Sequence, residues 1–361
     1  MVERTTLVLS GGSALGAYQA GACEALCGEG VRPDRIVATS IGAVNAAIIA
    51  GNPPDRRIES LRRFWNEAAL DGTAWALGMA LWGDGRARAL QSPMFGSPAI
   101  FRPRLPGGLS MLPGMPGDTS LYDLAPLRAT LERMVDFGCL NAAELPLTVV
   151  AMDLVTGEEV RFDTRRAPIG PEHLLASSGF PPFFPPVEID GRLLCDGGMG
   201  ANLPLEAALE EPSAEDRLCI AIDLFRRRGD RPRTVGQAMD RQLDLLLTSQ
   251  TWKAVEALRR THALRRHLRI LGDRMPDGRG ADADVASAMA EAAMGADGAT
   301  TLLLLSHTAV SHDVEMRAFD YSRTVLTERW DAGRVDMERA LRGLGARRAA
   351  PGAFVVHAVG T

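Results

Sequence analysis

Apolar and polar residues follow two alternating periodicities in the first part of the chain. Short apolar, β-prone runs occupy residues 6–9 and 35–39. Each leads through a tight turn into a helical pattern of small and apolar residues, at 14–26 and 41–50. Residues 55–69 add an amphipathic helix with its large apolar side chains on one stripe. Repeated strand–turn–helix units predict a parallel α/β structure.

The later part of the chain again contains predicted strands and helices, except for one irregular segment. Residues 71–120 are rich in Gly, Pro and Met and only weakly periodic, which predicts an irregular cap or lid insertion. The charged segment 226–233 is the best domain boundary, so we expect a first domain over 1–225 and a mostly helical extension over 226–361. Later strands of that extension are candidates for joining the first sheet. Further strands are predicted at 147–153, 159–162, 218–223 and 301–306, and further helices at 123–135, 235–267 and 322–344.

Together these elements predict a three-layer α/β/α fold with a mainly parallel central sheet and a helical C-terminal extension. The 361 residues are 46% hydrophobic and 24% charged, as in ordinary globular proteins. A net charge of −5 argues against a nucleic-acid partner. Five cysteines without C-x-x-C spacing argue against a disulfide framework and a zinc site.

From the sequence we expect neither a signal peptide nor a membrane-spanning helix. The N-terminal residues lack the apolar stretch of a signal peptide. The longest apolar runs, at 41–50 and 301–305, fall short of the about 18 residues that a spanning helix needs. We therefore expect a cytoplasmic protein whose membrane contact, if any, is peripheral.

The first candidate site is the glycine-rich turn "LVLSGGSALG", with Gly11, Gly12 and Gly16 between a strand and a helix. Such a turn lets backbone N–H groups and the helix dipole face a negatively charged oxygen. Similar turns bind dinucleotides, but that fingerprint requires G-x-G-x-x-G and an acidic residue roughly 20 positions later. Ser13 occupies the third position and the next strand ends "VATS", which disfavours dinucleotide binding.

The second candidate is Ser40, in "IVATSIGAVNAA". A serine between a strand and a helix, with small residues at −2 and +2, is typical of a nucleophile elbow. Here those positions hold Ala38 and Gly42. The alternative is an ordinary helix N-cap, for which serine is a favoured residue.

The third candidate is Asp196, which ends a predicted strand immediately before Gly197 and Gly198. A carboxylate at such a turn can face an active site. The alternative is a simple β-turn, in which Asp-Gly is common.

In this order, the three segments resemble the signature of the patatin-like phospholipase family: a glycine-rich loop, a G-x-S-x-G elbow and a later D-G-[AG]. The counterparts here are "GGSALG", "ATSIG" and "DGG". Further similarity lies in "GAYQAG", "IGAVNAA", "ASSGFPPFFPPV" and "GANLPL", so the resemblance covers roughly residues 5–225.

The resemblance implies a serine–aspartate dyad, with Ser40 as nucleophile and Asp196 as base. The backbone amides of Gly11, Gly12 and Ser13 would then hold the oxyanion. The expected reaction is hydrolysis of acyl esters of lipids through an acyl-enzyme, with no metal and no organic cofactor.

Two departures from the family pattern keep alternatives open. Ala38 replaces the first elbow glycine and Ser13 the third loop glycine, where a positive φ costs roughly 1 kcal/mol or more. These departures favour a catalytically weakened, lipid-binding regulatory protein as one alternative. The other alternative is an acyltransferase that uses the same dyad and an alcohol or thiol acceptor.

Other residues offer competing roles. His307 and His312, after a predicted strand, are the best candidates for a histidine base in place of Asp196. Asp282 and Asp284 lack the further ligands of a metal site. The arginine clusters at 226–233 and 259–269 are either exposed helix faces or surfaces for anionic membranes. Met and Trp residues in 71–120 form either a lid that touches lipid or a cap packed on the body.

Overall fold

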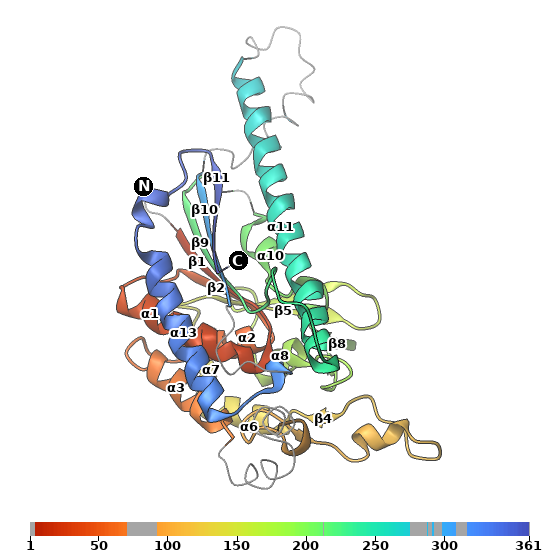
Figure 1. Ribbon diagram of the computed structural model, residues 1–361. Helices are drawn as coiled ribbons and strands as arrows, with labels where there is room; N and C mark the ends of the chain where they lie inside the picture. The colour runs from red at the N-terminus through yellow and green to blue at the C-terminus, as the bar shows by residue number, and fades with distance from the viewer. Residues whose placement is uncertain are drawn as a thin grey trace.

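The computed structural model describes residues 4–70, 92–211, 213–274, 298–307 and 316–360, with the single positions 287 and 291. Within these ranges, a nine-stranded sheet has the order β11-β10-β9-β1-β2-β5-β8-β7, and β6 pairs with β5 (Figure 1). The neighbours from β11 to β5 are parallel, whereas β6, β7 and β8 join antiparallel. The strands are β1 (Arg4–Leu9), β2 (Arg35–Thr39), β5 (Leu147–Asp153), β6 (Glu159–Asp163), β7 (Val187–Ile189), β8 (Arg192–Asp196), β9 (Arg217–Asp223), β10 (Thr300–Ser306) and β11 (Phe354–Val359).

Helices cover both faces of the sheet, which confirms the predicted three-layer α/β/α class. Successive side chains of a strand point to opposite faces, so Leu7 and Leu9 pack in one core cluster with α1 and α2, and Val8 packs in another with α10 and α11. Figure 1 shows α1, α3 and α13 on one side and α10 and α11 on the other. The helices are α1 (Gly16–Gly28), α2 (Ile41–Ala50), α3 (Arg57–Ala68), α6 (Ala125–Met134), α7 (Phe137–Asn141), α8 (Pro171–Ser178), α9 (Gly198–Ala201), α10 (Leu205–Leu209), α11 (Val235–Arg274) and α13 (Arg323–Leu341), with 3-10 turns η1 (Ser13–Leu15), η2 (Gly107–Met111), η3 (Arg317–Phe319) and η4 (Gly345–Arg347).

The C-terminal region shares the sheet and the core of the first half. Its strands β10 and β11 extend the sheet beyond β9. Its helix α13 crosses α1 so closely that a Cβ on Gly21 would lie 1.9 Å from the Trp330 carbonyl oxygen. A Cβ on Gly333 would lie 1.9 Å from the Tyr18 carbonyl oxygen. Only glycine permits this approach of the two backbones.

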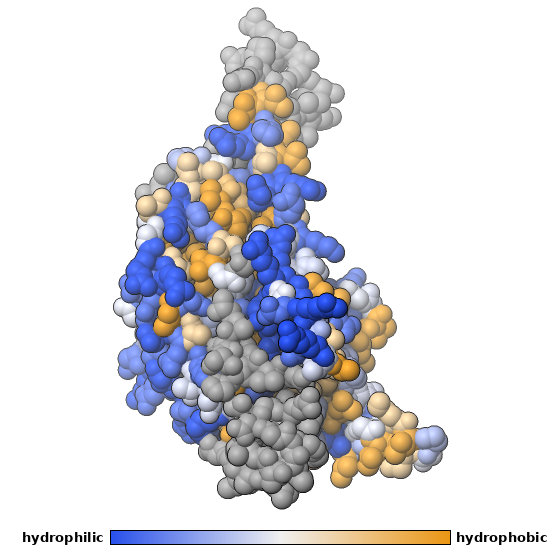
Figure 2. All heavy atoms as spheres, viewed as in Figure 1, coloured by the Kyte–Doolittle hydropathy of each residue, from blue (hydrophilic) through white to orange (hydrophobic). Residues whose placement is uncertain are grey.

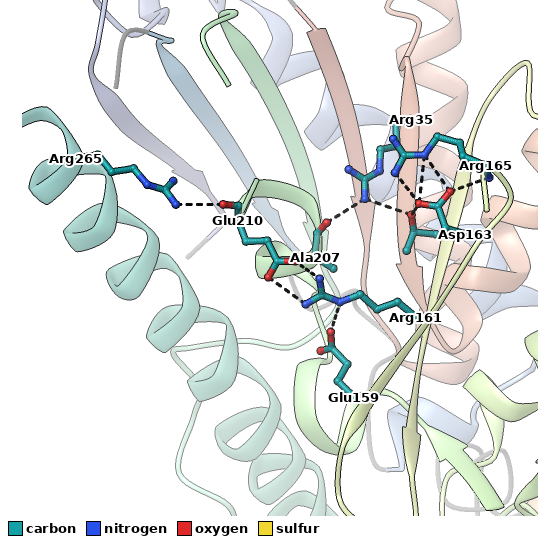
Figure 3. A network of polar contacts seen from close by, with 9 residues as sticks. Arg35, Glu159, Arg161, Asp163, Arg165, Ala207, Glu210 and Arg265 are labelled. Atoms are coloured by element: carbon teal, nitrogen blue, oxygen red, sulfur yellow. Dashed lines mark hydrogen bonds and ion pairs between the residues drawn. The ribbon is translucent and has the colours of Figure 1, made fainter. Parts of the chain in front are cut away.

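A polar network connects α10 and α11 with the sheet at the amino end of β2 (Figure 3). Arg35 donates a hydrogen bond of 3.0 Å to the Ala207 carbonyl in α10. Arg161 of β6 forms an ion pair with Glu210, which follows α10. Arg265 of α11 contacts the Glu210 carbonyl at 3.4 Å. The network lies at the end of β2 remote from Ser40.

Some elements differ from the sequence-based prediction. The helix predicted at 235–267 continues to Arg274. At 40 residues it is about 60 Å long, and its C-terminal part extends beyond the sheet in Figure 1. Strand β11 was not predicted, because most of its residues are only half-buried at the sheet edge. None of the described helices combines the length and apolar character needed to cross a bilayer.

The predicted irregular insertion is only partly described. Residues 71–91, including Trp75 and Trp82, lie outside the described residues. The remainder contains η2 and a two-residue strand, β3 (Arg102–Pro103), which pairs antiparallel with β4 (Tyr122–Asp123).

Candidate active site

Strand register brings Ser40 and Asp196 together. Thr39, the last residue of β2, pairs with Val150 of β5, so Ser40 lies level with Ala151. Because β8 runs antiparallel to β5, its last residue, Asp196, also pairs with Ala151. The Ser40 hydroxyl lies close enough to the Asp196 carboxylate to lower its pKa, and both side chains line one cavity. Two residues separated by more than 150 positions thus meet at one point of the sheet.

Ser40 occupies a sharp strand-to-helix turn with φ 56° and ψ −128°. Positive φ is unusual for a serine, and such strain is typical of functional sites. Ser40 stands at the N-cap position of α2, but its side chain makes no capping hydrogen bond, so it is not an ordinary N-cap. A Cβ on Gly42 would lie 2.6 Å from the carbonyl oxygens of both Leu9 and Ser10, which explains the glycine. Ala38 is fully buried, so the turn accommodates its methyl group.

Ser177 of α8 is hydrogen-bonded to the backbone of the elbow. Its hydroxyl accepts a hydrogen bond from the Ser40 amide at 2.8 Å and donates one to the Val150 carbonyl at 2.6 Å. Ser177 is fully buried. Ser177 lies in the segment "ASSGFPPFFPPV", which is part of the family resemblance, but the sequence predicted no role for it.

The glycine loop lies directly against the elbow. A Cβ on Gly11 would lie 3.0 Å from the Ser40 Cβ and 2.7 Å from the Asn202 Oδ1. The Gly11 amide donates to the Asn202 carbonyl at 3.2 Å. The amides of Gly12 and Ser13 have no hydrogen-bond acceptor among the described residues. These two amides, rather than that of Gly11, are therefore the ones available to a bound oxygen.

A buried polar chain holds the glycine loop in place. Gln19 of α1 donates to the Ser10 carbonyl at 2.8 Å. Asn45 of α2 donates to the Gly16 carbonyl at 3.0 Å and to Gln19 at 3.1 Å, and it accepts from the Trp65 indole at 3.0 Å. Buried polar groups with satisfied partners rigidify their surroundings. Sequence reasoning missed Gln19 and Asn45, although each is a polar residue in an otherwise small, apolar helix.

Asp196 is almost completely buried, and burial raises the pKa of its carboxyl to about 7. Hydrogen bonds from the Ser40 hydroxyl and the Gly198 amide, the latter 2.7 Å long, lower this pKa but do not outweigh burial. A Cβ on Gly197 would lie 2.5 Å from the Val150 carbonyl oxygen, so the turn needs glycine there. A carboxylate with a pKa near 7 is suited to accept a proton at neutral pH.

Ser40 and Asp196 line an apolar cavity with an empty volume of about 750 Å³. The walls come from segments far apart in the chain, including the region around η3, and the Ser13 hydroxyl and the Tyr321 hydroxyl lie 2.8 Å apart. The aromatic residues that line it are Phe180, Phe183, Phe184, Phe225, Phe319 and Tyr321.

The described histidines lie away from this cavity. His307 follows β10 and packs edge-on against Tyr18, with 4.9 Å between the ring centroids. His262 contacts the Gly352 carbonyl at 3.1 Å. His312, the other candidate base, lies outside the described residues. Among the described residues that line the cavity, Asp196 is the carboxylate.

Other carboxylates have different surroundings. Asp153 accepts from Arg192 at 2.7 Å and from the Val155 amide at 2.9 Å, and these contacts lower its pKa to about 2. It therefore stabilises a turn. No cluster of three metal-ligating side chains occurs among the described residues; Asp282 and Asp284 fall outside them.

Comparison with known proteins gives two family matches. A patatin-like phospholipase model matches residues 7–209, and a second model, described as patatin phospholipase, matches residues 247–350. VipD from Legionella pneumophila is similar at 14% identity over 95% of this chain and 67% of its own, with a TM-score of 0.43. ExoU, in its complex with SpcU from Pseudomonas aeruginosa, is 17% identical over 71% of this chain and 52% of its own, with a TM-score of 0.29. Because the first family model alone matches more than half of this chain, the chain belongs to the patatin-like phospholipase family of lipid acyl hydrolases.

Proposed function

We propose that the protein hydrolyses acyl esters of lipids, with Ser40 as nucleophile and Asp196 as general base. The observation that carries this proposal is the position of the Ser40 hydroxyl beside the buried Asp196 carboxylate at the wall of an apolar cavity. The apolar cavity is suited to an acyl chain, and the ester carbonyl would then lie beside Ser40.

Asp196 accepts the Ser40 proton as the serine oxygen attacks the ester carbonyl. General-base assistance of this kind is worth about 10²–10⁴-fold. The negative charge that develops on the carbonyl oxygen is held by the amides of Gly12 and Ser13, each such donor being worth about 10²–10³-fold. Asp196 returns the proton to the leaving alcohol. It then takes a proton from the water that attacks the acyl-enzyme, which releases the fatty acid and restores Ser40.

The two departures from the family pattern are compatible with catalysis. The Ala38 methyl is buried in an elbow that keeps the conformation of Ser40. Ser13 has φ 52°, and its hydroxyl has a partner in Tyr321, which offsets part of the strain. Neither residue displaces Ser40 from Asp196. These contacts favour an enzyme over a catalytically weakened lipid-binding protein.

The test is product analysis with mixed micelles of phosphatidylcholine and detergent. We expect the wild-type protein to release fatty acid and lysophospholipid, and Ser40→Ala and Asp196→Asn to lose at least 10²-fold in rate. Ser249→Ala, which removes an exposed hydroxyl on α11, serves as the matched control with wild-type rate. Fatty-acid release that persists in Ser40→Ala would contradict the proposal. Acyl transfer to added glycerol in place of fatty-acid release would identify a transacylase.

A further inference from the structure

An uncharged apolar segment projects from the body of the protein. Residues 105–117, here called the apolar loop, contain no charged residue. Figure 1 shows the segment around η2 standing away from the sheet at the lower right, and Figure 2 shows hydrophobic side chains there. Its five large apolar side chains are between 41% and 85% exposed: Leu105, Leu109, Met111, Leu112 and Met115.

The base of the apolar loop is joined to the wall of the catalytic cavity. The Leu121 amide donates to the Pro182 carbonyl at 3.0 Å, and the Tyr122 amide to the Phe183 carbonyl at 2.9 Å. Phe183 itself lines the cavity. Asp118 closes the neck of the loop by accepting from Arg104 at 2.9 Å and from the Gly107 amide at 3.2 Å. The chain that leaves the loop is therefore hydrogen-bonded directly to the wall of the catalytic cavity.

Several exposed large apolar side chains in one segment usually mark an interaction site. Residues 105–117 include three prolines and four glycines, and the only regular structure within them is the short turn η2. The segment thus offers neither a helix face nor a free strand edge to a protein partner. Separate apolar side chains on a projecting loop are suited to the boundary between lipid headgroups and acyl chains.

We propose that the apolar loop inserts into the surface of a lipid aggregate and brings the cavity to its substrate. The inference rests on the proposed lipid hydrolase function, because it makes the substrate's own aggregate the occupant. Ion pairs of Arg102 with Asp123 and of Arg104 with Asp118 neutralise the neck. Binding therefore depends on apolar contact and only weakly on anionic lipid or salt.

The arginine-rich end of α11 offers the competing surface. Its arginines at 259–269 would favour anionic lipid. Figure 1 places that end of α11 at the opposite end of the molecule from the apolar loop. Lipid bound there would hold the cavity away from its substrate.

The experiment is flotation of the Ser40→Ala protein with phosphatidylcholine vesicles, so that no lipid is hydrolysed during the measurement. We expect Met111→Ser with Leu112→Ser to lower partitioning at least tenfold, because burying one such side chain changes a partition constant by about that factor or more. The matched control is Leu264→Ser with Leu271→Ser, two exposed leucines near the far end of α11, which should partition like the parent. Adding anionic lipid should change these results less than twofold.

Four outcomes would overturn the inference. Unchanged partitioning of the loop variant would mean that the loop does not contact lipid, and a requirement for anionic lipid would assign binding to α11. A wild-type dimer that the loop variant converts to monomer would make the loop an interface between copies. Hydrolysis of a soluble short-chain ester by the wild-type protein, measured in parallel, reports on the proposed function separately. The inference alone fails if that ester is cleaved and vesicles are not bound.

Discussion

Substitution of Asp196 by asparagine should raise stability while it removes activity. The carboxyl has an ordinary pKa of 3.8 and a pKa of about 7 in the folded protein, because it is buried. Between these values the unfolded chain has released a proton that the folded protein still holds. The free energy of unfolding contributed by Asp196 therefore falls as pH rises through this window, and the loss is complete above pH 7.

The structure sets the size of this effect. The full difference between 3.8 and about 7 corresponds to about 4 kcal/mol, at 1.36 kcal/mol for each pH unit. Most of this difference, about 3 kcal/mol, develops between pH 5 and pH 8, because over most of that range the unfolded carboxyl is ionised and the folded one is protonated. Asparagine has nearly the same size, carries no charge, and its amide oxygen can still accept from the Gly198 amide. The stability of the variant relative to wild type should thus increase by about 3 kcal/mol over that range.

Urea unfolding of both proteins at pH 5, 6, 7 and 8 measures this difference. Asp223, a second buried carboxylate whose pKa is raised to about 6, is present in both proteins, so its contribution cancels. Activity should move in the opposite direction: wild-type kcat/KM should fall below about pH 7 as Asp196 gains its proton. A stability difference that stays constant from pH 5 to pH 8 would refute the view that burial holds this carboxyl protonated.

Three further predictions concern other residues. Tyr321→Phe should lower kcat by roughly two- to tenfold with little change in KM, because it removes the hydrogen bond to Ser13, and one hydrogen bond is worth about 0.5–1.5 kcal/mol. In a Ser13→Gly background the same substitution should have no additional effect. Additive losses in this double-mutant cycle would contradict the coupling of the two residues. Gly42→Ala should lower esterase activity at least 10²-fold, because the added methyl group would lie 2.6 Å from two carbonyl oxygens. Ala38→Gly, by contrast, should leave the free energy of unfolding within about 1 kcal/mol of the wild-type value. Asp153→Asn should lower the free energy of unfolding at neutral pH but not below about pH 2. The pKa of Asp153 is lowered from 3.8 to about 2, so its ionised form stabilises the folded state above pH 3.8, and this contribution is lost as the pH falls through about 2. Unfolding curves that show an equal loss at both pH values would contradict this.

The sequence pattern predicted the elements whose signals are local. Residues 35–39, 41–50 and 147–153 were predicted with the same bounds as β2, α2 and β5, because each is a mostly apolar run closed by a polar or glycine turn. The strand–turn–helix succession was sufficient to predict the three-layer class.

Features that depend on distant contacts were not predicted. The partner of Ser13 is Tyr321, 308 positions later, and no local pattern near either residue indicates the contact. Asn202 supplies the carbonyl that engages the Gly11 amide, so the choice between Gly11 and its neighbours as oxyanion donors also depended on tertiary structure. Strand β11 was missed because its residues are only partly buried at the sheet edge.

The most direct test of the account is labelling with a fluorophosphonate, followed by peptide mapping of the modified residue. Such a reagent reacts with a serine only when a neighbouring base activates the hydroxyl. We predict one label per wild-type chain, located on Ser40, no label on Ser40→Ala, and labelling at least 10²-fold slower for Asp196→Asn. A wild-type protein that stays unlabelled, or an Asp196→Asn protein that is labelled on Ser40 at the wild-type rate, would contradict the proposed dyad.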